Sequence, residues 1–265
     1  MSLRQVREVM GMPVTIFVGG DGPASRPAAE AALEDFALLD RTFSPFLPDS
    51  AVNRINRGEL AASESGGLVQ RAIELCRHYE RATGGYFSAW RDGRFEPSGL
   101  VKGWAIDRAC SILEGHGCTN YFVDAGGDVQ ARGSSDAGGP WRVGIRHPVS
   151  RNEVVRVIIA RDLAVATSGI YEKGDHIIDP HSGNPVRDWM SFTVVGPDIF
   201  DADVYATAGL AMGEAGLDFI ERIPGYEAYA IAPDLVARWT EGFDALCVSP
   251  TAAAITDIII EFAGP

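Results

Sequence analysis

Long hydrophobic runs are missing from this sequence of 265 residues. The longest apolar stretches, such as the one from Ile255 to Ala263, are interrupted by acidic residues. They are far shorter than the roughly 20 apolar residues that cross a bilayer. We therefore expect no transmembrane helix and no membrane insertion.

A secretion signal is also not expected from the start of the sequence as given, which reads MSLRQVREVMGMPVTIFV. Charged residues stand where a signal peptide has its apolar core, and neither a small-residue cleavage site nor a lipid-accepting cysteine follows. The sequence as given thus predicts a cytoplasmic protein.

Cysteine is scarce, with four residues scattered along the chain and no CxxC pair. A zinc knuckle or a disulfide framework needs closer ligand spacing, so the sequence excludes both. We expect reduced thiols in the core, as is typical of buried cysteine.

Positive charge is scarce as well, because 23 Lys and Arg stand against 36 Asp and Glu, for a net charge of −13. Such a surface repels nucleic acid and anionic membranes, and no run of Lys or Arg makes a local exception. An anionic substrate would need a local cluster of cations, backbone N–H donors or a metal ion.

Hydrophobic residues make up 46% of the chain, enough for a sizeable core, and their periodicity predicts both helices and strands. The irregular order of the elements and the hairpin-like spacing in the middle favour an α+β fold over a doubly wound sheet. Without a repeat, linker or low-complexity tract, a single domain over residues 1–265 is the simplest interpretation. The expected helices are 27–43, 67–83, 101–114 and 202–212, and the expected strands are 9–18, 121–124, 129–133, 141–145, 154–160 and 192–195.

Five polar segments rich in Gly or Pro lie at the predicted ends of elements, where sites are usually built. The first is EPSGLVKGWAID, residues 96–107, in which Lys102 stands at the opening of a helix. An ammonium beside the N–H groups of a helix N-terminus binds phosphate well. Taken alone, however, Lys102 is better explained as a solvated lysine of the first turn.

The second segment is DAGGD, residues 124–128, directly after a predicted strand. Paired glycines allow a backbone to approach a ligand closely, and Asp128 could accept hydrogen bonds from a base or a ribose. A tight β-turn is the alternative interpretation. The segment is not GxGxxG, so a Rossmann dinucleotide site is not predicted.

The third segment begins with Thr167 and Ser168 and continues to His176 in HIIDP. Adjacent hydroxyls can bind a phosphate or ribose, and a histidine before a turn could act as a general base. A lone histidine is more often structural, and this alternative stays open.

The fourth segment contains Asp203 and Thr207, which are four residues apart in a predicted helix and so share one face. Two hard oxygen ligands, completed by carbonyls, waters and substrate phosphate, suit Mg²⁺. The alternative is a carboxylate near a helix N-terminus beside a buried threonine. The fifth segment, FSPFLPDSAVNRIN at residues 43–56, is expected to be a loop in which Phe46 could stack on a flavin or adenine ring.

The order of these motifs is more specific than any one of them. The series MGMPVTIFV, FSPFLPDSAVNRIN, SGLVKGWAID, DAGGD, TSGIYEKGDHIIDPHSGNPV and ADVYATAGLAMG resembles the motif set of the ApbE family over about residues 9–245. The resemblance implies an α+β fold related to the T-fold, with FAD bound in a cleft between two lobes of one domain. It also implies a Mg²⁺-dependent FAD:protein FMN transferase, which attaches FMN from FAD to a threonine of an acceptor protein and releases AMP.

The resemblance assigns roles to individual residues. Lys102 would lie near the FAD phosphates, and Asp203, Thr207 and the carbonyl of Gly99 would hold the metal. His176 would help to deprotonate the incoming threonine, so that the catalytic residues are His176, Lys102 and Asp203. The FAD site would further include Met10, Phe46, Glu96, Ser98, Asp107, Gly126, Gly127, Asp128, Thr167 and Ser168.

The chain departs from the family pattern at Phe46, where tyrosine is common, and at Glu96 and Lys173, where aspartate and arginine are common. Family acceptors carry threonine in a short Asp-x-x-Ser/Thr-(Gly)-Ala-Thr sequence, which the chain's own Asp201–Thr207 segment does not match, so self-modification is not expected. Two alternatives remain: an FAD pyrophosphatase that gives FMN and AMP, and a non-catalytic FAD-binding protein. Asp203 and Thr207 argue against the second.

Overall fold

The computed structural model of the chain describes residues 2–20, 22–91, 93–136, 138–150, 152–169, 179–248 and 258–259. Its main feature is an eight-stranded sheet in which every neighbouring pair of strands is antiparallel. The strand order is β1 (Leu3–Val9), β2 (Met12–Val18), β5 (Tyr121–Ala125), β6 (Asp128–Arg132), β9 (Ala164–Gly169), β10 (Ser191–Gly196), β11 (Glu227–Ile231) and β12 (Ala237–Trp239).

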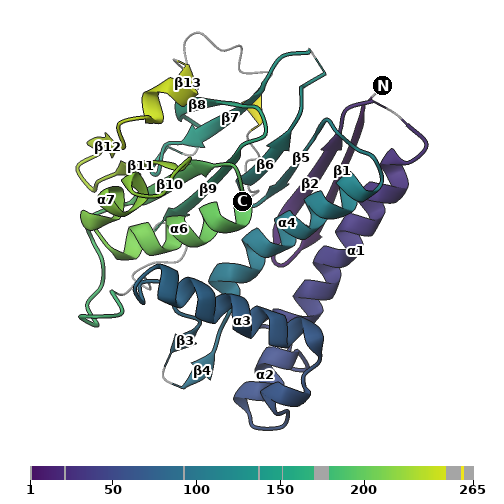
Figure 1. Cartoon of the computed structure of the whole chain (residues 1–265), viewed down its shortest axis with the longest axis vertical. Helices are drawn as coiled ribbons and strands as arrows, with labels where there is room; N and C mark the ends of the chain where they lie inside the picture. Colours follow the sequence, from purple (N-terminus) through teal and green to yellow (C-terminus); the bar gives the residue numbers. More distant parts are fainter. Residues whose placement is uncertain are drawn as a thin grey trace.

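Helices cover one face of this sheet, and a second sheet covers part of the other (Figure 1). The helices on the sheet are α1 (Ser25–Phe43), α4 (Ser98–Gly115) and α6 (Ile199–Ala211), with α3 (Gly67–Ala82) packed outside them. The second sheet has the order β13 (Cys247–Val248), β8 (Val154–Ala160), β7 (Trp141–Arg146) and β14 (Ile258–Ile259). The remaining elements are α2 (Ala51–Asn56), α7 (Ala215–Glu221), the hairpin β3 (Trp90–Arg91) and β4 (Arg94–Phe95), and short 3₁₀ turns at Ala62–Glu64 and Phe243–Leu246.

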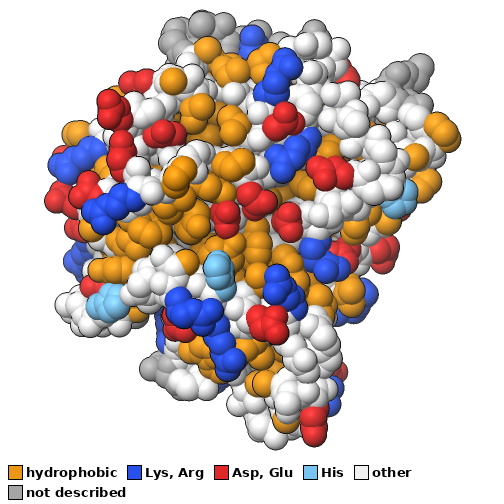
Figure 2. Space-filling model, viewed as in Figure 1, with side chains coloured by type: hydrophobic (Ala, Val, Ile, Leu, Met, Phe, Trp, Pro, Cys, Tyr) orange, Lys and Arg blue, Asp and Glu red, His pale blue; other side chains and the backbone are white. Residues whose placement is uncertain are grey.

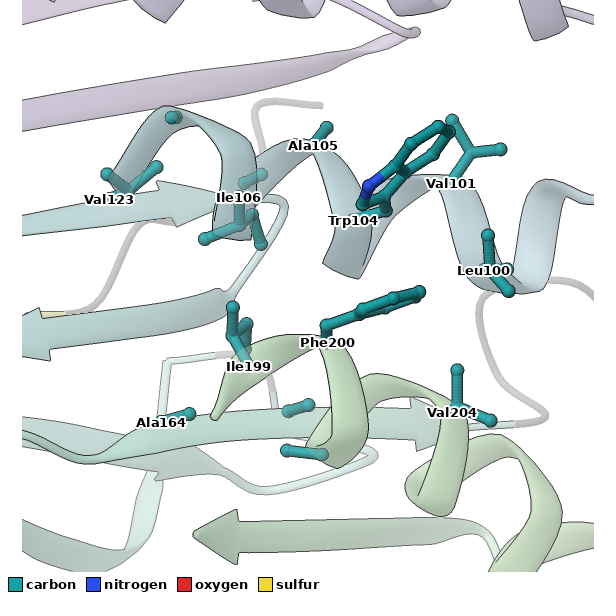
Figure 3. Packing of buried hydrophobic residues seen from close by; sticks show 14 of the residues in the cluster. Leu100, Val101, Trp104, Ala105, Ile106, Val123, Ala164, Ile199, Phe200 and Val204 are labelled. Atoms are coloured by element: carbon teal, nitrogen blue, oxygen red, sulfur yellow. The ribbon is translucent and has the colours of Figure 1, made fainter. Parts of the chain in front are cut away.

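The central strands are buried on both faces, and their side chains alternate between two cores. On β5, Tyr121 and Val123 pack toward the helices, whereas Phe122 packs toward the second sheet. Figure 3 shows Val123 facing Ile106 of α4, with Ile199 of α6 close by. The apolar residues on the helix side of the strand therefore hold α4 and α6 against the sheet, and those on the other side hold the second sheet.

The α+β class is confirmed, and the expected helices agree with α1, α3, α4 and α6 to within three residues at each end. The expected strand at residues 9–18 is wrong in one respect, because the strand there begins only at Met12. It is the second arm of a hairpin, whose first arm, β1, ends at Val9. Met10 and Gly11 form the two-residue turn between β1 and β2, with φ of 57° and 73°. Both positive φ angles are typical of the type I′ turn that matches the twist of paired strands.

The expected loop at residues 43–56 is also only partly a loop. Its second half forms α2, which Ser50 caps by accepting a hydrogen bond of 3.2 Å from the N–H of Asn53. Within the part of the chain that the structure describes, no helix has the length and apolarity needed to cross a membrane.

Candidate active site

The candidate site lies where α4 and α6 meet the ends of β6 and β9. The two helices approach closely at Gly103, whose N–H donates a hydrogen bond of 2.8 Å to Oδ2 of Asp203. A Cβ atom on Gly103 would lie 2.8 Å from Cβ of Asp203, closer than real Cβ contacts. The glycine after Lys102 therefore allows α6 to bring its carboxylate directly against α4.

Three charged side chains from three elements meet beside this contact. Nζ of Lys102 lies 2.5 Å from Oδ2 of Asp128 and 3.6 Å from Oδ1 of Asp203. The two carboxylates are almost completely buried, while a quarter of the Lys102 side chain is exposed. The ammonium is thus the charged group of this cluster that a ligand can reach from solvent.

The pKa of Asp203 reflects this crowding. Burial raises the pKa of Asp203 to about 6, and the neighbouring Asp128 carboxyl acts in the same direction. Lys102 and the N–H of Gly103 oppose the rise, because both stabilise the carboxylate. The positive charge of Lys102 is therefore needed to keep this pair of acids in one buried cluster.

The adjacent hydroxyls of β9 point to opposite faces of the sheet. Ser168 faces the helices, and its Oγ lies 3.1 Å from Oγ1 of Thr207 on α6. Thr167 faces the second sheet, where its Oγ1 lies 2.9 Å from Oγ1 of Thr193, but its N–H donates to Oδ1 of Asp128 at 2.9 Å. Only Ser168 therefore brings a hydroxyl to the helix side, while Thr167 fixes Asp128 through its backbone.

The DAGGD segment forms the turn between β5 and β6. Gly126 and Gly127 have φ of 62° and 96°, and the N–H of Gly127 donates to Oδ1 of Asp124 at 2.9 Å. Positive φ angles favour glycine at both positions, and a Cβ on Gly126 would also lie 2.9 Å from Sδ of Met12. The tight β-turn interpretation is confirmed, and the turn also aims Asp128 at Lys102.

The oxygen atoms near Asp203 fit a small hard cation. Thr207 is one helical turn after Asp203, and the position of a Cβ on Gly99 would lie 3.9 Å from Cγ2 of Thr207. The described residues contain no cluster of three or more His, Cys, Asp and Glu side chains that could hold a metal by themselves. Mg²⁺ usually takes one or two carboxylates together with waters and substrate phosphates. The carboxylate of Asp203 and the hydroxyl of Thr207 are hard oxygen donors of the kind that could hold Mg²⁺, and they lack the nitrogen and sulfur ligands typical of Zn²⁺.

The other residues predicted for the FAD site are not among the described contacts of this cluster, and their assignment stays a prediction. Phe46 is 89% exposed in the loop before α2, and Glu96 is exposed just before α4. Ser98 is the first residue of α4, so this helix begins three residues before the expected start at Val101, and Lys102 stands one turn inside it. Met10 lies in the β1–β2 turn and not within the early strand. His176 lies outside the described residues, so its predicted role stays a prediction.

Asp107 lines a different cavity, on the outer side of α4. This cavity of about 410 Å³ lies between α3, α4 and α6, with Trp104 and Phe200 in its wall and Arg71 and His78 also lining it. Figure 2 shows charged side chains of both signs and a histidine around the middle of this face. Burial raises the pKa of Asp107 to about 6, and Asp198 adds to the rise. None of the residues near Lys102 lines this cavity, so the assignment of Asp107 to the same site is not supported by its position.

Three residues that lie near the site were not assigned to it from the sequence. Gly103 and Met12 make the close contacts described above, and Nη2 of Arg146 lies 3.6 Å from the position of a Cβ on Gly127. Gly103 stands in the KG motif and Met12 in MGMP, so both could have been found there. Arg146 is remote in sequence and had no local signal.

Comparisons with known proteins show which family this chain is similar to. The model of the ApbE family matches residues 90–230, which include Lys102, Asp128, Asp203 and Thr207. A FAD:protein FMN transferase from Vibrio cholerae is 36% identical over 127 residues, which is 44% of this chain and 38% of the relative. Another from Klebsiella pneumoniae is 30% identical over 147 residues, covering 52% of this chain and 42% of the relative. The matched segment thus spans about two fifths of these curated relatives.

Solved structures extend the likeness to almost the whole chain. The ApbE protein from Thermotoga maritima superposes with a TM-score of 0.79 at 24% identity and covers 93% of this chain and 99% of its own. The flavin transferase ApbE from Vibrio cholerae gives a TM-score of 0.78 at 22% identity, with the same coverage of 93% and 99%. At these identities the likeness establishes a common fold.

Proposed function

Because this chain belongs to the ApbE family, we propose that it is a Mg²⁺-dependent FAD:protein FMN transferase, with FAD as substrate and a threonine of an acceptor protein as target. One observation carries the proposal. Lys102 contacts Asp128 and Asp203, and one helical turn along α6 from Asp203 the hydroxyl of Thr207 contacts that of Ser168, so residues from four separate elements form two neighbouring contacts. The relatives that carry the name FAD:protein FMN transferase support the same activity.

The proposed reaction exchanges one P–O bond for another. The threonine Oγ of the acceptor bonds to the phosphorus of the FMN half, and the bond from this phosphorus to the bridging oxygen breaks. The bridging oxygen leaves with AMP, and the hydroxyl proton goes to a base. Reactions of this kind depend mainly on positioning and on electrostatic stabilisation, so few catalytic side chains are needed.

Lys102 is the residue that we assign to the pyrophosphate. Its ammonium already lies against two carboxylates, which hold it in place and leave part of it open to solvent. A phosphate oxygen that approaches from the exposed side would gain a charge-assisted hydrogen bond. Asp128 therefore acts as a positioning residue, because it fixes Lys102 and is itself fixed by the N–H of Thr167.

Asp203 and Thr207, with the carbonyl of Gly99, are the residues that would hold Mg²⁺. When bound, Mg²⁺ neutralises charge on the pyrophosphate oxygens and on the leaving group. Ser168 keeps the Thr207 hydroxyl oriented through their 3.1 Å contact. Gly103 holds the Asp203 carboxylate through its N–H, so the oxygen set is preorganised by α4.

The test uses the full chain with FAD, Mg²⁺ and a peptide that contains an Asp-x-x-Ser/Thr-Gly-Ala-Thr sequence. We expect an increase in peptide mass by one FMN group, with AMP released in equal amount. The matched control is the same peptide with valine in place of the final threonine, which should stay unmodified.

Three other results have definite meanings. AMP release without modification of any acceptor would identify an FAD pyrophosphatase. FAD binding with neither product would identify a non-catalytic binding protein. Equal affinity for FAD and FMN, measured by flavin fluorescence, would contradict recognition of the AMP half of FAD.

A further inference from the structure

Strand β1 forms one edge of the main sheet. It has seven residues and pairs with β2 on one side only, and no other described strand pairs with its outer side (Figure 1). The opposite edge strand, β12, has only three residues. A long edge strand presents a row of main-chain N–H and C=O groups that can bind another strand.

The turn between β1 and β2 determines which main-chain groups point outward. Val9 and Met12 flank a two-residue turn, in which the C=O of the first residue faces the N–H of the last. Hydrogen-bonded and non-bonded pairs then alternate along an antiparallel ladder. Every second residue of β1, counted back from Val9, therefore directs its main chain toward β2.

A hydrogen bond accepted by Pro13 supports this alternation. Pro13 is opposite Glu8, and its C=O accepts a hydrogen bond of 3.2 Å from the N–H of Gly126, so it faces β5 and not β1. The pair of Glu8 and Pro13 is thus a non-bonded pair of the β1–β2 ladder. The residues whose main-chain groups face outward are Arg4, Val6 and Glu8.

The side chains of the same three residues form a symmetric pattern. They are exposed, share one face of the strand, and read positive, apolar and negative, with Val6 56% exposed at the centre. If a second β1 runs antiparallel across a two-fold axis at Val6, Arg4 is opposite Glu8 of the second copy. Val6 is then opposite Val6 of the second copy. The same register also pairs the outward main-chain groups with each other.

We propose that two copies of this chain form a symmetric dimer by antiparallel pairing of their β1 strands, centred on Val6. Charged side chains on an edge strand commonly prevent such pairing. Here the two signs are placed symmetrically about Val6, so each charge meets its opposite across the interface. The main sheets of the two copies then become one continuous sheet.

Helix α1 is compatible with this arrangement. It packs on both β1 and β2, and Arg7 of β1 holds it through Glu30 at 3.0 Å and Glu34 at 2.7 Å. A helix that covers two strands spaced about 4.8 Å apart occupies a width of about 10 Å. The helices of two copies would then lie side by side at an ordinary packing distance of about 8–10 Å.

Sedimentation equilibrium of the full chain over a range of concentrations tests the proposal, and a dimer is expected. Val6→Pro removes the outward N–H at the centre of the interface but no hydrogen bond to β2, so we expect a monomer with an unchanged fold by circular dichroism. A wild-type chain that is monomeric at its highest soluble concentration would overturn the proposal.

Charge reversal tests the register separately. Arg4→Glu or Glu8→Arg alone places like charges opposite each other twice, and each should weaken the dimer by about tenfold or more. The double variant Arg4→Glu with Glu8→Arg should restore it. The matched control is Arg161→Glu, at an exposed arginine between β8 and β9, which should leave dimerisation unchanged. A dimer that none of the β1 variants weakens, or that the double variant does not restore, would place the interface elsewhere.

Discussion

The substitution Gly103→Ala tests how closely the site depends on the contact between α4 and α6. The added Cβ would lie 2.8 Å from Cβ of Asp203, 2.9 Å from its Oδ2 and 3.2 Å from the carbonyl oxygen of Ile199. None of these neighbours is the end of a flexible chain, because Asp203 is buried and hydrogen-bonded to Gly103 itself. The helices must therefore separate by roughly half an ångström or more to reach ordinary contact.

The magnitude follows from two opposing effects. Overpacking of a core contact costs about 1–3 kcal/mol. Alanine is favoured over glycine within a helix by up to about 1 kcal/mol, which offsets part of this cost. We expect a net loss of about 1–2 kcal/mol in the free energy of unfolding, or a melting temperature lower by about 2–8 °C for a chain of this size.

The effect on activity should be larger than the effect on stability. A displacement of about 1 Å in a positioned group can reduce a reaction rate by about 10²-fold. Displacement of Asp203 should therefore reduce Mg²⁺-dependent AMP release by about 10²-fold at a temperature where the variant is still folded.

Gly115→Ala is the matched control, because it makes the same change in the same helix and its Cβ would meet nothing within 4 Å. The assay compares melting curves by circular dichroism with AMP release from FAD for both variants. The reasoning is refuted if Gly103→Ala melts and reacts like the wild type, or if the two variants behave alike.

Three further predictions concern charged groups. Asp203→Asn should abolish Mg²⁺-dependent AMP release but leave some FAD binding. The control is Asp201→Asn in the same helix, which should keep AMP release. It should lower the melting temperature, because Asp201 accepts hydrogen bonds from the hydroxyls of Tyr79 and Tyr226. His176→Ala should lower the rate of threonine modification by about 10²–10⁴-fold and lower FAD hydrolysis much less, since water needs less help from a base. Equal loss of both activities would show that His176 does not act as the base for the acceptor. Burial raises the pKa of Asp107 to about 6, so the folded state holds this proton more tightly than the unfolded state and loses stability as pH rises through about 4 to 6. Asp107→Asn should therefore melt like the wild type near pH 4 and at a higher temperature than the wild type near pH 8, and a difference of the same size at both pH values would refute this.

The sequence by itself determined the elements of the fold and the chemistry that the site can contain. Helical periodicity located α1 and α3 because their buried residues recur at every third and fourth position. The spacing of Asp203 and Thr207 placed both on one face of α6, which is a local property of any helix. The turn at Gly126 and Gly127 was predictable for the same reason, because positive φ angles favour glycine.

Only the tertiary structure decided which of these residues meet. Lys102 and Asp128 are brought together by the packing of α4 on the sheet, and no local pattern carries this information. Asp107 lines a cavity that Lys102 does not line, because the two residues lie on different sides of α4, although the sequence grouped them in one motif. The side chains of Thr167 and Ser168 lie on opposite faces of the sheet, because neighbouring residues of a strand alternate, although both belong to one motif. Local periodicity depends on neighbours a few residues apart, whereas the meeting of distant side chains depends on how whole elements pack, so the first can be read from the sequence and the second cannot.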